Sequence, residues 1–109
     1  MNYQHLILKV SCRTPERMFD DRLLENALIG ACHKAGAHVL RTAQHHFYPQ
    51  GFTMAVLLAE SHATIHSFPE NNESMIDFFS CSEDPKFDLF TDFLFEYGFD
   101  IVSSTVMER

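Results

Sequence analysis

The side chains best suited to chemistry in this sequence are concentrated in a single stretch, residues 59–81. This stretch holds a hydroxyl at Ser61, imidazoles at His62 and His66, and a thiol at Cys81. Such groups can act as a nucleophile, a general base and a proton donor when a fold brings them together. Each also has an ordinary structural explanation, because hydroxyls form hydrogen bonds and an isolated cysteine behaves as a small buried apolar residue. Their order and spacing must therefore decide between the two.

Metal binding is the first alternative to weigh. His62 and His66 lie four residues apart, but no third ligand stands beside them, so ordinary polar histidines explain the pair better and we predict no metal. The three cysteines, Cys12, Cys32 and Cys81, form no Cys-x-x-Cys pair, which argues against a zinc knuckle and a disulfide framework. We expect Cys12 and Cys32 to be small apolar core residues.

Length and charge restrict the class of protein. The 109 residues suit a single domain over 1–109. With 15 acidic and 8 basic side chains, the formal charge of −7 repels phosphate backbones, so we expect no nucleic-acid partner. No apolar run approaches the roughly 20 residues that span a bilayer, and the first residues do not resemble a secretory signal. We therefore expect no membrane partner and a cytoplasmic location.

The elements that position these residues follow from the apolar periodicity. Alternation and apolar runs predict strands over residues 6–12, 52–59 and 61–68, with further strands within 37–47, 75–81 and 99–106. Helical spacing predicts one helix within 15–35 that is ended by Gly36. A second helix is predicted to follow Asp84-Pro85, with Asp84 as its N-cap and Phe87, Phe90 and Leu94 facing the core.

This order of elements predicts an α+β fold, a two-layer sandwich with an antiparallel sheet and two helices on one face. The other face of the sheet is then free to bind a ligand or a second copy of the chain. The 11 phenylalanines indicate that part of it is covered.

Several motifs together resemble one known family. Residues 59–70 read Ala-Glu-Ser-His-Ala-Thr-Ile-His-Ser-Phe-Pro-Glu, and residues 77–81 read Asp-Phe-Phe-Ser-Cys. This order resembles the short bacterial S-adenosylmethionine decarboxylase proenzymes, with their Glu-Ser-His-x-x-Ile-His-x-aromatic-Pro-Glu and Asp-x-aromatic-x-Cys runs. His5-Leu6, Ala35-Gly36-Ala37 and the turn from His46 to Gly51 fit the same family, so the resemblance covers nearly the whole chain.

The resemblance implies that the chain cleaves itself between Glu60 and Ser61 into residues 1–60 and 61–109. The Ser61 hydroxyl would attack the Glu60 carbonyl, and elimination from the ester would leave a pyruvoyl group in place of Ser61. His66 is implied as the base of this processing, supported by the Thr53 hydroxyl. The pyruvoyl group would form a Schiff base with the substrate, and Cys81 would donate a proton to the product carbon.

The resemblance also implies a substrate site and an assembly. Phe47 and Phe68 occupy aromatic positions able to stack on adenine, and Glu70 resembles the residue that holds ribose hydroxyls. The implied function is decarboxylation of S-adenosylmethionine for polyamine synthesis, by a homodimer of cleaved protomers.

One geometric condition accompanies this mechanism. Ser61 and His66 have opposite parity, so in a regular strand their side chains point to opposite faces. We therefore expect a bend or bulge between them that lets His66 reach Ser61.

Two other functions stay open. Phe52-Thr53-Met54, Ser82 and the turn 70–75 depart from the family pattern, and the turn borders the expected substrate pocket. The same chemistry on ornithine or arginine is therefore an alternative. A non-catalytic relative that binds a ligand or partner is another, although Ser61, His66 and Cys81 are all retained.

Overall fold

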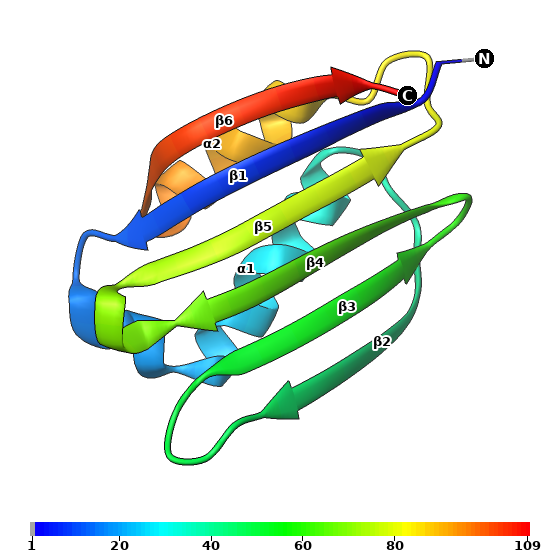
Figure 1. Ribbon diagram of the computed structural model, residues 1–109. Coiled ribbons are helices and arrows are strands. Elements are labelled where there is room, and N and C mark those ends of the chain that lie inside the picture. The colour runs from blue at the N-terminus through cyan, green and yellow to red at the C-terminus, as the bar shows by residue number, and fades with distance from the viewer. Residues whose placement is uncertain (1) are drawn as a thin grey trace.

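The computed structural model describes residues 2–109 as a sheet covered by two helices (Figure 1). In chain order the elements are β1 (Gln4–Cys12), η1 (Pro15–Phe19), α1 (Asp21–Lys34), β2 (Val39–His46), β3 (Phe52–Leu58), β4 (Ser61–Phe68), η2 (Pro69–Asn71), β5 (Glu73–Ser80), α2 (Phe87–Tyr97) and β6 (Phe99–Glu108). The strands form one sheet in the order β2-β3-β4-β5-β1-β6, and every neighbouring pair is antiparallel. The predicted α+β two-layer sandwich is confirmed.

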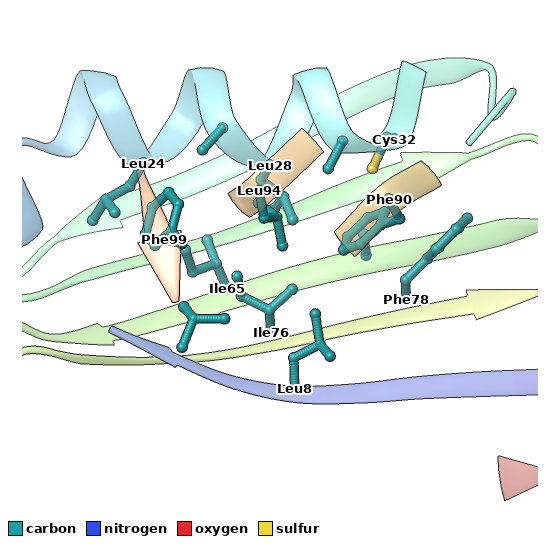
Figure 2. Packing of buried hydrophobic residues seen from close by; sticks show 14 of the residues in the cluster. Leu8, Leu24, Leu28, Cys32, Ile65, Ile76, Phe78, Phe90, Leu94 and Phe99 are labelled. Carbon is teal, nitrogen blue, oxygen red and sulfur yellow. The ribbon is translucent and has the colours of Figure 1, made fainter. Parts of the chain in front are cut away.

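The core lies between the sheet and the helices (Figure 2). Each inner strand contributes alternate residues, as Leu6, Leu8 and Val10 do on β1, because successive side chains point to opposite faces. From α2, Phe90 is fully buried and stacks on Phe78 of β5 with ring centroids 4.9 Å apart. The prediction that the phenylalanines of this helix include core residues is confirmed.

Cys12 and Cys32 are buried, as expected. Burial raises the pKa of the Cys32 thiol to about 12, because the thiolate would lose its hydration. Burial likewise raises the pKa of Cys12, against the opposing effect of Arg17 and Arg13. Both thiols are thereby kept protonated and unreactive.

Helix α1 begins and ends on strong local signals. The Asp20 carboxylate accepts a hydrogen bond from the Leu23 N–H at 3.1 Å, which caps the first turn. At the other end Gly36 has φ +81°, and the amides of Gly36 and Ala37 bond back to the carbonyls of His33 and Cys32. This pattern is a Schellman motif, which needs a left-handed residue after the helix. The predicted stop at Gly36 is confirmed.

The predicted start of the second helix is wrong. Helix α2 begins at Phe87 after Lys86, whose φ is +55°, and no side chain caps it. Asp84 is engaged elsewhere, because its amide bonds to the Ser82 hydroxyl at 3.2 Å in a separate turn. The Phe87 ring meets Phe78 edge-on at 5.5 Å, so packing on the sheet sets where the helix starts.

Strand β4 is straight, so the predicted bend between Ser61 and His66 is wrong. It pairs without a register shift with β3 from Ser61 to Ser67 and with β5 from His62 to Phe68. A strand held on both sides keeps its alternation, so His66 is exposed on the face away from the helices while Ala63 and Ile65 point into the core. We call this helix-free surface the open face.

Within residues 2–109 no helix is long and apolar enough to cross a membrane.

Candidate functional site

The bond predicted to break lies in a tight turn at one end of the sheet. Ala59 and Glu60 join β3 to β4, and Leu58 pairs with Ser61 where the turn closes. Glu60 has φ +64°, in the left-handed region that costs a residue with a Cβ roughly 1 kcal/mol or more. The peptide carbonyl next to Ser61 therefore belongs to a strained residue held by the two strands.

Cys81 lies against this same carbonyl. Its thiol donates a hydrogen bond to the Glu60 carbonyl oxygen, with Sγ 2.9 Å from the oxygen. Such a donor polarises the carbonyl, which favours attack by a nearby hydroxyl. The structure therefore brings Glu60, Ser61 and Cys81 together.

A cavity of about 240 Å³ opens beside these three residues. Its walls are the exit of α1 at Gly36, the turn at Glu60 and the end of β5 at Ser80. Figure 1 shows why they meet, since the loop after α1, the β3–β4 turn and the end of β5 all lie at the same end of the sheet. We call Glu60, Ser61, Cys81 and this cavity the serine end.

The other predicted site residues form a second group. Thr53 and His66 are direct partners on β3 and β4, and the Thr53 hydroxyl lies 3.1 Å from His66 Nδ1. The pair borders a second cavity of about 330 Å³. Its lining also includes the remaining predicted binding residues, Phe47, Phe68 and Glu70. We call this group the histidine end.

Strand β4 separates the two groups. Ser61 and His66 are five residue steps apart along an extended strand, which at about 3.3 Å per residue is roughly 16 Å. No side-chain rotation closes that gap. Within one chain, His66 therefore does not reach Ser61.

Sequence reasoning missed a third polar group on the open face. His5 of β1 and Asp77 of β5 form a hydrogen bond with His5 Nε2 2.7 Å from the carboxylate, and His62 of β4 lies beside them. Thr64 donates to the other oxygen of Asp77. Alternation along each strand could have assigned all four to one face, but their contact depends on the strand order β4-β5-β1.

The fold is a small α+β sandwich, and its candidate site residues form two separate groups at opposite ends of one sheet. The model of the S-adenosylmethionine decarboxylase family matches residues 4–108. The chain therefore belongs to the S-adenosylmethionine decarboxylase family.

Individual relatives agree with this assignment. The chain is 39% identical over 80 residues to an S-adenosylmethionine decarboxylase proenzyme of Parasynechococcus marenigrum, an alignment that covers 73% of this chain and 62% of the relative. It is 38% identical over 80 residues to S-adenosylmethionine decarboxylase proenzyme 2 of Halalkalibacterium halodurans, covering 73% of this chain and 63% of that protein. The chain thus spans less than two thirds of the length of either relative.

A solved structure has the same fold. The crystal structure of the adenosylmethionine decarboxylase from Aquifex aeolicus superposes with a TM-score of 0.82, covering 99% of this chain and 90% of the other. The two sequences are 23% identical.

Proposed function

We propose that this chain is a self-cleaving, pyruvoyl-dependent decarboxylase of S-adenosylmethionine. The observation that carries the proposal is the contact between the Cys81 thiol and the Glu60 carbonyl, at a strained turn directly before Ser61. The word proenzyme in the names of the relatives also supports a chain that matures by cleavage.

The cleavage uses groups that the chain itself supplies. The Ser61 oxygen bonds to the Glu60 carbonyl carbon, the amide C–N bond breaks, and the nitrogen takes a proton, which leaves an ester. A base then removes the Cα proton of residue 61, and the Glu60 carboxylate departs from its β-carbon. The resulting dehydroalanine rearranges to an imine. Water then hydrolyses the imine and ammonia is released, which leaves a ketone at the new N-terminus of 61–109. The Cys81 hydrogen bond stabilises the negative charge that develops on the Glu60 oxygen.

The residues of the serine end fit the group that this cleavage makes. A pyruvoyl group there supplies an electron-withdrawing ketone next to a carbonyl, which accepts the electron pair released with carbon dioxide. The adjoining cavity of about 240 Å³ leaves room at that position for the reacting part of a small substrate. Cys81 lies where a proton donor is needed, so its thiol returns a proton to the substrate carbon.

The base has to come from a second copy of the chain. His66 is roughly 16 Å from Ser61 within one protomer, given the strand rise of about 3.3 Å per residue. In a twofold dimer formed through the open face, one end of each sheet can lie over the opposite end of the other. Ser61 points to the opposite face from His66, but it is the first residue of β4 and lies at the end of the sheet. His66 of the partner subunit therefore has to reach Ser61 around the end of the strand.

The open face has the composition of such an interface. It carries large apolar side chains that are more than a third exposed, among them Ile7, Leu57 and Phe68, and such exposed apolar groups are a feature of interaction surfaces. The dimer also completes the substrate site, because it adds the cavity of the histidine end to that of the serine end. Phe47 and Phe68 then offer rings for an adenine, and Glu70 offers a carboxylate for ribose hydroxyls.

A basic amino acid such as ornithine or arginine is the second candidate substrate. The turn that departs from the family pattern borders the histidine end and is fixed by Asn72, whose side chain bonds both the N–H and the C=O of Cys12. The exposed Glu70 carboxylate beside it could pair with a side-chain cation as well as with ribose.

Release of carbon dioxide from carboxyl-labelled substrates tests the proposal. Purified protein should release label from S-adenosylmethionine, with ornithine and arginine assayed in parallel. The Ser61→Ala chain is the control, and it should be inactive on all three because alanine has no oxygen to form the ketone. Release of labelled carbon dioxide only from ornithine or arginine would show that a basic amino acid is the substrate. Release from none of the three compounds would contradict the proposal that the chain is a decarboxylase.

A further inference from the structure

We propose that His5, His62 and Asp77 form a binding site for one divalent first-row transition metal ion. The imidazole nitrogens of the two histidines and a carboxylate oxygen of Asp77 all lie within 4.8 Å of one another. Ligand atoms around a zinc ion are about 3.3 Å apart, given bond lengths of about 2.0–2.2 Å. We infer that a metal ion would draw these atoms together by small rotations of their side chains.

The scaffold of the site is rigid. Its three residues come from the adjacent strands β4, β5 and β1. His5 and His62 both pair directly with Phe79, one from each side, and Asp77 lies two residues before Phe79 and points to the same face. A metal site built on neighbouring strands is held more precisely than one on loops.

Neighbouring side chains orient all three ligands. The Thr64 hydroxyl donates to Asp77 Oδ1, which leaves Oδ2 directed at His5. The Phe79 ring stacks on His62 with centroids 5.4 Å apart and meets His5 edge-on at 6.0 Å. Such outer contacts hold ligating imidazoles and carboxylates in place in metal sites.

The type of ligand selects the type of metal. Two imidazoles and one carboxylate suit Zn²⁺, Co²⁺ or Fe²⁺, whereas Mg²⁺ and Ca²⁺ prefer oxygen ligands alone. Three protein ligands leave at least one coordination position for water or another group. The single carboxylate and the net charge of −7 both favour a cation at this face.

The metal site lies on the open face through which the proposed dimer forms, but it can be tested apart from the decarboxylase chemistry. It uses neither the Ser61 hydroxyl nor His66, although His62 directly follows Ser61 in the chain. The uncleaved Ser61→Ala chain should therefore bind the metal as well as the mature protein does, so failure of one proposal is distinguishable from failure of the other.

Titration of the Ser61→Ala chain with Co²⁺, followed by its visible absorption, tests the site. We expect one equivalent to bind per chain, and Zn²⁺ to displace it. His5→Gln and Asp77→Asn, added separately, should weaken binding at least tenfold, while His45→Gln on the exposed strand β2 should leave it unchanged.

A second measurement uses a chain in which all three ligands are intact, so it does not depend on whether the substituted chains fold. Bound Co²⁺ is paramagnetic, so among the seven histidines the ring-proton signals of His5 and His62 should shift most. Absence of Co²⁺ and Zn²⁺ binding would overturn the proposal. So would shifts centred on other histidines, or full binding by a folded His5→Gln chain.

Discussion

At the scale of single residues, the two ends of the proposed site use hydrogen bonds in different ways. At the serine end a thiol donates to the carbonyl of a strained residue, and in the proposed cleavage this hydrogen bond would polarise the carbonyl that Ser61 attacks. At the histidine end a hydroxyl lies against His66 Nδ1 and fixes the orientation of the ring. Which ring nitrogen is free to accept a proton during processing is set by the hydrogen bond that the other nitrogen makes.

The Thr53 hydroxyl should therefore matter for processing. Thr53→Val keeps the shape of the side chain and removes the bond to His66, and we expect cleavage to slow about tenfold, the effect of a bond worth roughly 1.4 kcal/mol. Thr53→Ser should cleave at nearly the normal rate. The time course of cleavage on a denaturing gel measures this, with Thr42→Val on exposed β2 as the control. Normal cleavage by Thr53→Val would show that the bond plays no part.

The Cys32 thiol should make the protein less stable at alkaline pH. Its folded pKa is raised to about 12, so above the ordinary thiol pKa of 9.0 the unfolded chain loses the proton first. The stabilisation is complete below pH 9 and is lost as pH rises toward 12, by about 1.4 kcal/mol per pH unit. Urea unfolding at pH 8 and pH 10 should show a larger loss for the wild type than for Cys32→Ala. Equal losses would mean that Cys32 ionises freely in the fold.

At the scale of elements, helix α1 and its stop build one wall of the serine end. Gly36 has φ +81°, and a Cβ there would meet nothing within 4 Å, so its cost is purely one of backbone conformation. Gly36→Ala should lower the free energy of unfolding by about 1 kcal/mol, and Gly36→Asn by less, since asparagine tolerates the left-handed region better. Urea unfolding measures both.

The exposed Lys34→Ala substitution in the last turn of α1 serves as the control and should change stability by less than about 0.5 kcal/mol. A Gly36→Ala chain as stable as the wild type would show that the Schellman turn is not needed.

Most of the elements could be predicted because their signals are local. Alternating residues such as Leu6, Leu8 and Val10 predict a strand, and Gly36 predicts the end of a helix, from neighbours in the sequence alone. The start of α2 could not be predicted, because the packing of Phe87 on Phe78 overrides the capping signal at Asp84. Tertiary contacts decide such boundaries.

The candidate site residues could be named from the sequence, but their division into two separate groups could not be predicted. The parity of Ser61 and His66 already indicated opposite faces, so a bulge would have been needed to bring them together within one chain. Only the unbroken pairing of β4 with both neighbours shows that no bulge forms. The neighbours His5, His62 and Asp77 could not be found at all without the strand order.

At the scale of the whole molecule, the proposed processing needs a site shared by two chains, because Ser61 and His66 are far apart within one chain. When Ser61→Ala and His66→Ala chains are coexpressed, a mixed dimer holds one site with both groups intact. With random pairing, roughly half of the His66→Ala chains should then be cleaved, whereas each variant alone stays whole. No cleavage in the mixture would place the whole site within one chain. Denaturing gels of chains with distinct tags distinguish the two.

The most direct test of the central claim is the intact mass of the purified protein under denaturing conditions. We predict two pieces, residues 1–60 and 61–109, with the second lighter by one ammonia molecule than a peptide that begins with serine. The Ser61→Ala chain should give a single mass for residues 1–109. A wild-type protein that stays whole, or a second piece that begins with an unmodified serine, would contradict the account.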